Sequence, residues 1–141
     1  MRIFKSSWFN KAAKKAHIKD SELRMAIDQV IKGQAVDLGG GVFKKRLNEN
    51  RHRSIILSKS GLFWVYEFLF AKKDLDNIDD HELAKFRQLA GIYAKLSEEQ
   101  VKKLLQNKSL VEIGDENKTK TITYHQRNSR PLPSKSMRTL T

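Results

Sequence analysis

The sequence predicts an α+β domain with helices at its N-terminal end, an antiparallel sheet of about four strands in the middle and further helices after the sheet. Apolar residues recur every three or four positions near the start and again between 79 and 105. Between these regions, β-branched and aromatic runs alternate with turn-forming residues. The 141 residues suit one domain, which we place at 1–113, followed by an appended segment at 114–141.

A short strand and two short helices, arranged as a hairpin, are expected at the N-terminal end. Residues 2–5 have the composition of an edge strand. Ser6 is a candidate N-cap for a first helix in which Trp8 packs inward, because a serine hydroxyl can accept a hydrogen bond from a backbone N–H of the first turn. Asp20 is the corresponding candidate for a second helix, which ends at Gly33.

The middle of the domain carries three runs typical of strands, at residues 42–47, 53–58 and 61–71. Turn-prone segments separate them, which predicts an antiparallel meander. Three glycines at 39–41 indicate a sharp turn or a bulge leading into the sheet, since the Gly-Lys-Ser/Thr of a phosphate-binding loop does not follow them. Alternation along the last run places four aromatic residues on one face, where we assign them to the core: Trp64, Tyr66, Phe68 and Phe70.

Two capping boxes mark the helices after the sheet. Asp79 is followed three residues later by Glu82, and Ser97 by Gln100, each ahead of apolar residues at helical spacing. After residue 113 the composition becomes polar and basic and includes both prolines of the chain. We therefore expect residues 114–141 to form a basic, disordered tail.

The charge of the chain narrows the choice of partner. Lys and Arg number 28 against 16 Asp and Glu, and this net charge of +12 favours an anionic partner. Nucleic acid ranks ahead of a membrane surface or an acidic protein. Residues 114–141 hold six Lys and Arg and two acids, so the domain itself keeps a charge of +8. A merely basic protein without an anionic ligand is the alternative.

Missing residue types exclude several kinds of chemistry. With no cysteine, the chain has no disulfide, thiolate metal site or cysteine nucleophile, which fits a reducing compartment and makes the cytoplasm the expected location. No apolar run approaches the roughly 18 residues that cross a membrane, and the first residues do not read as a secretory leader. The four histidines lack metal-ligand spacing, so neither a metal nor a cofactor is expected.

A cationic cluster is expected on the sheet. In the run at 42–47, strand alternation places Lys44 and Arg46 on the same face. In the next run, it places Arg53 on the same face as Ile55. If the two strands pair, the three side chains meet on a surface suited to phosphate, because guanidinium groups hold phosphate oxygens bidentately. A solvated sheet face without a ligand is the alternative explanation.

Several segments together resemble a known family. They are 38–47, which reads Leu-Gly-Gly-Gly-Val-Phe-Lys-Lys-Arg-Leu, then 53–57, 70–78 and 82–90. In order and spacing they are similar to the HigB-like branch of the RelE/ParE superfamily, and the resemblance runs from residue 2 to 113. It implies a RelE-like fold and the toxin of a type II toxin–antitoxin pair. Such a toxin is usually a ribosome-dependent, metal-independent endoribonuclease that cleaves translated mRNA and inhibits translation, held inactive in a hetero-oligomer with its cognate antitoxin.

The resemblance also implies roles for individual residues. Basic side chains in such toxins orient the ribose 2′-hydroxyl, stabilise the pentacovalent phosphate and assist the leaving 5′-oxygen. Matched by position, the expected catalytic residues are Lys44, Arg46, Arg53 and Lys72, and the expected RNA-binding residues are Lys45, Arg51, His52 and Lys73.

The chain departs from the family pattern just ahead of Arg53. Family members commonly carry a glycine-containing segment there, whereas residues 48–52 read Asn-Glu-Asn-Arg-His. Arg51 and His52 are candidate replacement groups. Two alternatives on the same scaffold stay open: a toxin that poisons DNA gyrase, and a non-catalytic RNA-binding module.

Overall fold

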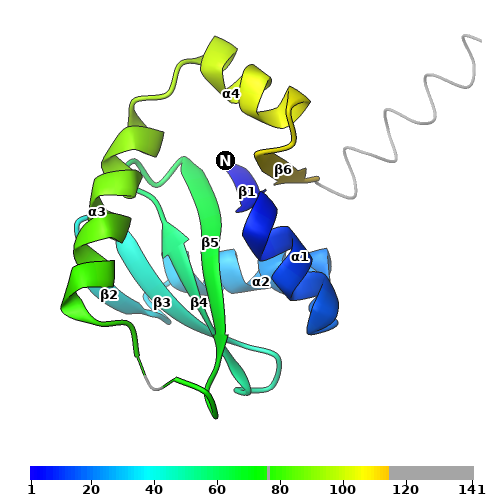
Figure 1. The fold of residues 1–141 in the computed structure, drawn as a ribbon, viewed down its shortest axis with the longest axis vertical. Coiled ribbons are helices and arrows are strands. Elements are labelled where there is room, and N and C mark those ends of the chain that lie inside the picture. The colour runs from blue at the N-terminus through cyan, green and yellow to red at the C-terminus, as the bar shows by residue number, and fades with distance from the viewer. Residues whose placement is uncertain (76, 115–141) are drawn as a thin grey trace, which may run out of the picture.

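A mixed six-stranded sheet forms the centre of the fold in the computed structural model, which describes residues 1–75 and 77–114 (Figure 1). The strands are β1 (Arg2–Ser6), β2 (Val36–Gly39), β3 (Val42–Leu47), β4 (His52–Leu57), β5 (Phe63–Ala71) and β6 (Leu110–Ile113). They lie in the order β2-β3-β4-β5-β1-β6. Neighbouring strands are antiparallel except β1 and β5, which run parallel.

Four helices lie in the described part of the chain and cover both faces of the sheet. They are α1 (Ser7–Lys15), α2 (Asp20–Ile31), α3 (Asp80–Ala94) and α4 (Glu98–Gln106). The pair α1 and α2 covers one face, and α3 and α4 cover the other (Figure 1). The predicted α+β class is therefore confirmed. Of the predicted tail at 114–141, all but the first residue lies outside the described residues.

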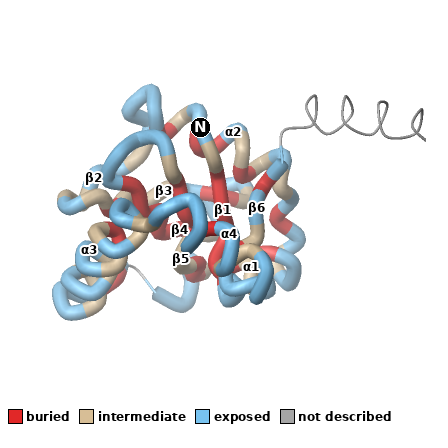
Figure 2. The backbone as a smooth tube through the Cα atoms, turned by 90° about the horizontal axis from the view of Figure 1, so that it is seen from above, coloured by how far each residue is buried: buried red, intermediate tan, exposed pale blue. Residues whose placement is uncertain are grey.

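The core fills the space between the sheet and each helical layer, and buried residues follow the strands (Figure 2). On one face, Phe9 of α1 and Leu23 of α2 pack around Tyr66, whose hydroxyl donates to the Leu23 carbonyl oxygen at 2.7 Å. On the other face, Ala90 of α3 packs in one cluster with Ile55 of β4. Each large apolar side chain buried in this way contributes about 1.5–3 kcal/mol. The strands that carry the site are therefore held rigidly.

The start of α1 agrees with the sequence prediction, but the start of α2 does not. The Ser6 side chain accepts from the Phe9 backbone N–H at 3.0 Å, which confirms Ser6 as the N-cap. The prediction for Asp20 is wrong, because Lys19 is the N-cap of α2 and Asp20 is its first helical residue. The Asp20 carboxylate instead accepts from the buried Lys5 ammonium at 2.7 Å, and a buried charge needs such a partner.

The two N-terminal helices pack chiefly on the sheet, which corrects the predicted hairpin. Helix α1 lies against β1 and β5, and α2 lies against β3. A sheet face offers each amphipathic helix more apolar surface than a second short helix does. Trp8, expected to pack inward, is 51% exposed and stacks on Phe68, with ring centroids 5.0 Å apart.

The sheet is wider than the predicted four strands, and it is mixed. Strand β1 is not an edge strand, because it lies between β5 and β6 with Phe4 fully buried. Its parallel register joins Arg2 to Phe63, a pairing that no local sequence pattern reports. Strand β6 has only four residues and was not predicted, since so short a run carries little periodicity.

A β-bulge divides the aromatic run of β5 between the two faces. Tyr66 and Phe68 pair with consecutive residues of β4, so Glu67 between them is an extra residue. Trp64 and Tyr66 consequently pack towards α1 and α2, whereas Phe68 and Phe70 pack towards α3. The prediction that all four rings share one face is wrong, although all four contribute to the core.

The turn and capping signals in the sequence are confirmed. Asp79 with Glu82 forms a capping box at the start of α3, and Ser97 with Gln100 forms one at the start of α4. The three glycines at 39–41 connect β2 to β3 with positive φ angles of 84°, 64° and 85°. Glycine adopts this left-handed backbone without steric cost.

Candidate functional site

The β3–β4 hairpin brings two arginines opposite each other. Arg46 of β3 is in register with Arg53 of β4, and Lys44 lies two residues from Arg46 on the same face. Arg46 is exposed, whereas Arg53 is only 8% exposed. Like charges that face each other on a sheet destabilise it. An anion bound between the two guanidinium groups would remove this repulsion.

The buried arginine is fixed by the turn that connects the two strands. Arg53 Nη1 donates to the carbonyl oxygens of Asn50 at 3.0 Å and His52 at 3.2 Å. A guanidinium held in this way loses little conformational freedom when a ligand binds. Lys44 has a looser contact, with its Nζ 3.4 Å from Asn77 Oδ1.

The connecting turn adopts a backbone that usually requires glycine. Asn48, Glu49 and Asn50 have φ angles of 55°, 52° and 71°, all in the left-handed region. Helix α2 anchors the turn, because Glu22 Oε2 accepts from the Asn48 backbone N–H at 2.6 Å. The glycine-free segment is therefore held in its conformation by a specific contact.

A pocket of about 780 Å³ opens beside this turn, where β4 starts and β5 ends. Its walls come from three parts of the chain: the end of α1, the turn with the start of β4, and the residues around the end of β5. The lining residues are Lys15, Ala16, Asn50, Arg51, His52, Ala71, Lys72, Lys73 and Asp74. Four cations and one carboxylate give the pocket a positive field, which attracts phosphate and other anions.

The eight residues predicted from the sequence fall into two groups and one outlier. The groups are Lys44, Arg46 and Arg53 on the sheet face towards α3, and Arg51, His52, Lys72 and Lys73 around the pocket. The outlier is Lys45, which alternation turns to the face towards α2. The two groups are neighbours on the sheet. Arg46 of β3 pairs with Arg53 of β4, and His52, the residue before Arg53, pairs with Ala71 at the end of β5.

Lys45 has its own partner away from the pocket. Its Nζ donates to the Gln34 carbonyl oxygen at 3.0 Å. Partial burial, and then the nearby charge of Arg46, lower the pKa of this ammonium from its ordinary value. The structure therefore does not bring Lys45 together with the other predicted site residues.

Burial and the surrounding charges together shift the pKa of the pocket histidine, His52. Partial burial, followed by the positive charges of Arg51 and Lys73, lowers the pKa of His52, and the carboxylates of Glu22 and Asp74 oppose the shift. Together these effects favour the neutral form of the imidazole. Arg51 itself donates from Nη2 to Asn48 Oδ1 at 3.0 Å and to Glu49 Oε1 at 3.2 Å.

Comparison with known proteins places the chain in a family. Residues 1–113 match the family described as the RelE toxin of the RelE/RelB toxin–antitoxin system. The chain belongs to the RelE toxin family. Searches of curated proteins and of solved structures gave no match. As a toxin of this system, the protein has a cognate antitoxin as its partner, and both groups of candidate residues lie in the matched range.

Several residues of the candidate site escaped the sequence prediction. Lys15 and Asp74 line the pocket, and Glu22 anchors the turn. Only tertiary packing brings Lys15 of α1 beside β4, so no sequence motif could have found it. The two asparagines of the turn were a usable signal, because Asn tolerates a left-handed backbone better than most residues.

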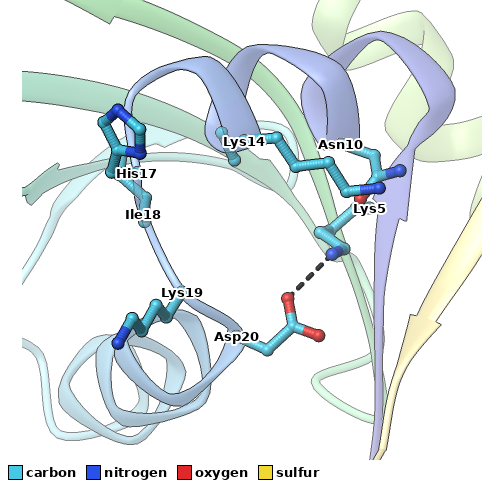
Figure 3. A pocket seen from close by; sticks show the side chains of 8 residues that line it. Lys5, Asn10, Lys14, His17, Ile18, Lys19 and Asp20 are labelled. Atoms are coloured by element: carbon cyan, nitrogen blue, oxygen red, sulfur yellow. Dashed lines mark hydrogen bonds and ion pairs between the residues drawn. The ribbon is translucent and has the colours of Figure 1, made fainter.

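A second, smaller pocket of the toxin lies at the corner between α1 and α2 (Figure 3). It measures about 470 Å³ and carries Lys14, His17 and Lys19 among its lining residues. At its base Lys5 and Asp20 form the 2.7 Å ion pair described above, so the buried charge already has its partner. We assign this pair a structural role, because it ties β1 to the first residue of α2.

The described segments of the toxin, residues 1–75 and 77–114, lack two further kinds of feature. In these segments no three His, Asp or Glu side chains gather as metal ligands would. None of the helices in the same segments has the length and apolar character needed to cross a membrane.

Proposed function

We propose that this RelE-family toxin is a HigB-like endoribonuclease that cleaves translated mRNA on the ribosome without a metal ion. Family membership supports the role of a toxin opposed by an antitoxin. The observation that carries the nuclease assignment is the gathering of cations at one end of the sheet. There the arginine pair of β3 and β4 adjoins a pocket with four cationic side chains and a histidine.

The proposed reaction needs only groups of the RNA itself and positive charge around them. The ribose 2′-oxygen attacks the neighbouring phosphorus and the bond to the 5′-oxygen breaks, which leaves a 2′,3′-cyclic phosphate and a 5′-hydroxyl. Overall, the 2′-hydroxyl proton ends on the departing 5′-oxygen. Charge accumulates on the phosphate oxygens in the transition state, where fixed cations stabilise it most.

We assign roles by position in the site. Arg46 and Arg53 stabilise the pentacovalent phosphate, and Lys44 supports them from the same strand face. Lys72 assists the departing 5′-oxygen. Arg51 and Lys73 hold flanking phosphates at the pocket. Lys45, tied to Gln34, is left with a minor electrostatic contribution.

Dependence on the ribosome follows from what the pocket contains. Asp74 is its single carboxylate lining residue, and its other charged lining residues are the cations Lys15, Arg51, Lys72 and Lys73. Without a strong general base, the toxin gains most from a substrate already held in a reactive geometry. A ribosome that fixes mRNA in its decoding site supplies that orientation.

The antitoxin is proposed to neutralise the toxin in a hetero-oligomer by covering the cationic end of the sheet. The domain charge of +8, counted from the sequence, calls for acidic groups on the covering surface. Association of toxin and antitoxin should then be fast at low salt and slower as ionic strength rises.

Inducing the toxin in cells with and without its antitoxin tests the proposal. We expect growth arrest and shortened transcripts in the toxin-only culture, mapped by 5′-end sequencing, and neither effect when both proteins are made. Arrest with intact transcripts and gyrase trapped on DNA would instead assign the protein to the gyrase-poisoning branch. RNA binding with neither arrest nor cleavage would indicate a non-catalytic RNA-binding module.

A further inference from the structure

The Asn48 side chain has its amide orientation fixed by two partners of opposite kind. Its Oδ1 accepts at 3.0 Å from Arg51 Nη2, an atom that can only donate. Its Nδ2 donates at 3.5 Å to the Ala16 carbonyl oxygen, an atom that can only accept. Exchanging the two amide atoms would break both contacts. The atom of Asn48 that faces His52 is therefore the donor, Nδ2.

This orientation determines which nitrogen of His52 carries the proton. Asn48 Nδ2 lies 3.2 Å from His52 Nδ1, and an amide N–H can bond to that nitrogen only through its lone pair. The neutral imidazole must then carry its proton on Nε2. His52 lines the pocket, and Nε2 is the ring nitrogen left for a ligand. It is presented to that ligand as an N–H donor.

We propose that Asn48 is a positioning residue that holds His52 as the Nε2–H tautomer, so that His52 donates a hydrogen bond to a phosphate oxygen in the pocket and is not the general base. The ligand part of this proposal rests on the proposed function. The tautomer part concerns the free protein. A base role would require a free lone pair on Nε2 or Nδ1, and this geometry uses both nitrogens otherwise.

Helix α2 extends the positioning role beyond the turn. Glu22 Oε2 accepts from the Asn48 backbone N–H at 2.6 Å and holds this residue at a φ of 55°. Three chain segments thus meet at Asn48: the end of α1 through Ala16, α2 through Glu22, and the start of β4 through His52. The segment at 48–52 departs from the family's glycine pattern. It contains both His52 and Asn48, the residue that orients the His52 ring.

The tautomer can be read directly in the full-length free protein by long-range ¹H–¹⁵N NMR of the imidazole rings. The chain has four histidines, and a His52→Gln sample assigns the His52 signals by their disappearance. We expect a pyridine-like nitrogen at Nδ1 and a pyrrole-like nitrogen at Nε2. A His52 ring protonated on Nδ1 would overturn the proposal.

Two variants are compatible with the left-handed backbone at position 48 and change the hydrogen bonds of its side chain, among them the one to His52. Asn48→Gly removes the amide, so the His52 signals should move towards a mixture of tautomers. Asn48→Asp replaces the donor with an acceptor, so the proton should move to Nδ1 and the His52 pKa should rise by about one unit or more. An unchanged tautomer in both variants would contradict the proposal.

A neighbouring position provides the matched control for these spectra. Glu49→Gly changes the next residue, which has a similar φ of 52° and does not line the pocket. Its His52 spectrum should match that of the unaltered protein.

The pH titration of the His52 ring reflects all the charges that face it. Arg51 and Lys73 lower its pKa, Glu22 and Asp74 raise it, and Lys15 and Lys72 line the same pocket.

Cleavage assays on ribosome-bound mRNA distinguish the two possible roles of His52, as a hydrogen-bond donor or as a general base. A glutamine side chain can donate through its amide but cannot accept a proton, so His52→Gln should keep cleavage within about tenfold of the unaltered protein. His52→Ala should lose roughly 10²-fold, the usual scale for one donor to a developing charge. Equal losses in both variants would overturn the donor role.

Separate measurements test the proposed function and the tautomer of His52. If the unaltered toxin cuts no mRNA, the proposed function fails while the NMR result still decides the tautomer. If mRNA is cut and His52 carries its proton on Nδ1, the proposed function stands and the positioning role of Asn48 is wrong.

Discussion

Arg46 and Arg53 face each other across two strands, but the structure holds them in different ways. Arg46 is exposed, and the only described neighbour that faces it in register is another cation. Arg53 is buried and donates to two carbonyl oxygens of the turn. The side chain of Arg46 is therefore available to a ligand, whereas that of Arg53 supports the turn in addition to the ligand role that we propose for it.

Arg46→Ala should lose roughly 10²-fold of mRNA cleavage, because it removes one cation from the transition state. Its free energy of unfolding should be unchanged or slightly raised, since the repulsion from Arg53 disappears. Rates of cleavage on programmed ribosomes and urea unfolding measure the two effects.

Arg53→Ala and Lys44→Ala serve as comparisons on the same sheet face. Arg53→Ala should lose a similar factor in cleavage but also unfold at lower urea, because the turn loses two hydrogen bonds to a charged group. Lys44→Ala should cost less cleavage than Arg46→Ala. Normal cleavage by a folded Arg46→Ala protein would remove this face from the site.

Glu49→Gly should raise the free energy of unfolding by about 1 kcal/mol. Glu49 sits at a φ of 52°, where a side chain carries a steric cost of about 1–2 kcal/mol that glycine avoids, and the larger conformational entropy that glycine loses on folding offsets part of this gain. The exposed ion pair with Arg51 that the variant loses is worth little. Urea unfolding at pH 7 measures the change, and a lower midpoint than that of the unaltered protein would show that the turn is not strained.

At this scale the sequence predicted part of the site. Alternation along two neighbouring strands was enough to place Lys44, Arg46 and Arg53 on one face. The pocket could not be predicted, because Lys15 reaches it through the packing of α1 and Asp74 through the end of β5. The left-handed backbone of the turn was missed because its residues are not glycines, although its two asparagines tolerate that backbone.

Strand β5 and helix α3 are joined by a carboxyl–phenol contact that the bulge makes possible. Glu67, the extra residue, turns towards α3, where its Oε1 accepts from the Tyr93 hydroxyl at 2.9 Å. Burial raises the pKa of Glu67 above its ordinary value, although the Tyr93 hydrogen bond acts in the opposite direction. The folded state therefore binds a proton here more tightly than the unfolded chain does.

This contact predicts a pH dependence of stability. Because the native state holds the Glu67 proton to higher pH, its contribution is present below the ordinary carboxyl pKa and is lost as pH rises through the raised one. Glu67→Gln should therefore match the unaltered protein near pH 4 and become the more stable of the two by pH 7. Urea unfolding across this range measures the difference, and one that does not grow with pH would contradict the account.

Elements marked by local chemistry were predictable, and those fixed by distant contacts were not. The capping boxes of α3 and α4 and the Ser6 cap of α1 each depend on residues within one turn. The parallel pairing of β1 with β5, and strand β6 beside β1, depend on contacts between segments far apart in the sequence. The predicted alternation of side chains along β5 is correct up to Tyr66. Beyond this residue the bulge moves Phe68 and Phe70 to the other face of the sheet.

For the whole molecule, the main property is an excess of positive charge that the domain and the following residues share. Of the total of +12, the sequence assigns +8 to residues 1–113. Part of the domain charge lies at the end of the sheet that holds the arginine pair and the pocket. We propose that mRNA and the antitoxin compete for this surface.

Truncation after Gly114 should weaken RNA binding and spare antitoxin binding. The removed residues carry six Lys and Arg, so the slope of log affinity against log salt should fall by several units. Arg24 still has the Gly114 carbonyl oxygen to donate to, at 2.6 Å. Filter binding over a salt series and calorimetry with the antitoxin measure the two affinities. Loss of antitoxin binding by a folded truncation would show that residues 115–141 belong to the interface.

The most direct measurement is cleavage of one defined mRNA by the purified toxin, with and without translating ribosomes, mapped by primer extension. We expect cuts within the translated region that require ribosomes, leave a 2′,3′-cyclic phosphate and a 5′-hydroxyl, and are strongly reduced with Arg46→Ala. Equal cutting of the free mRNA would contradict the proposed dependence on the ribosome. An intact mRNA in both samples, with a folded toxin, would contradict the endoribonuclease assignment itself.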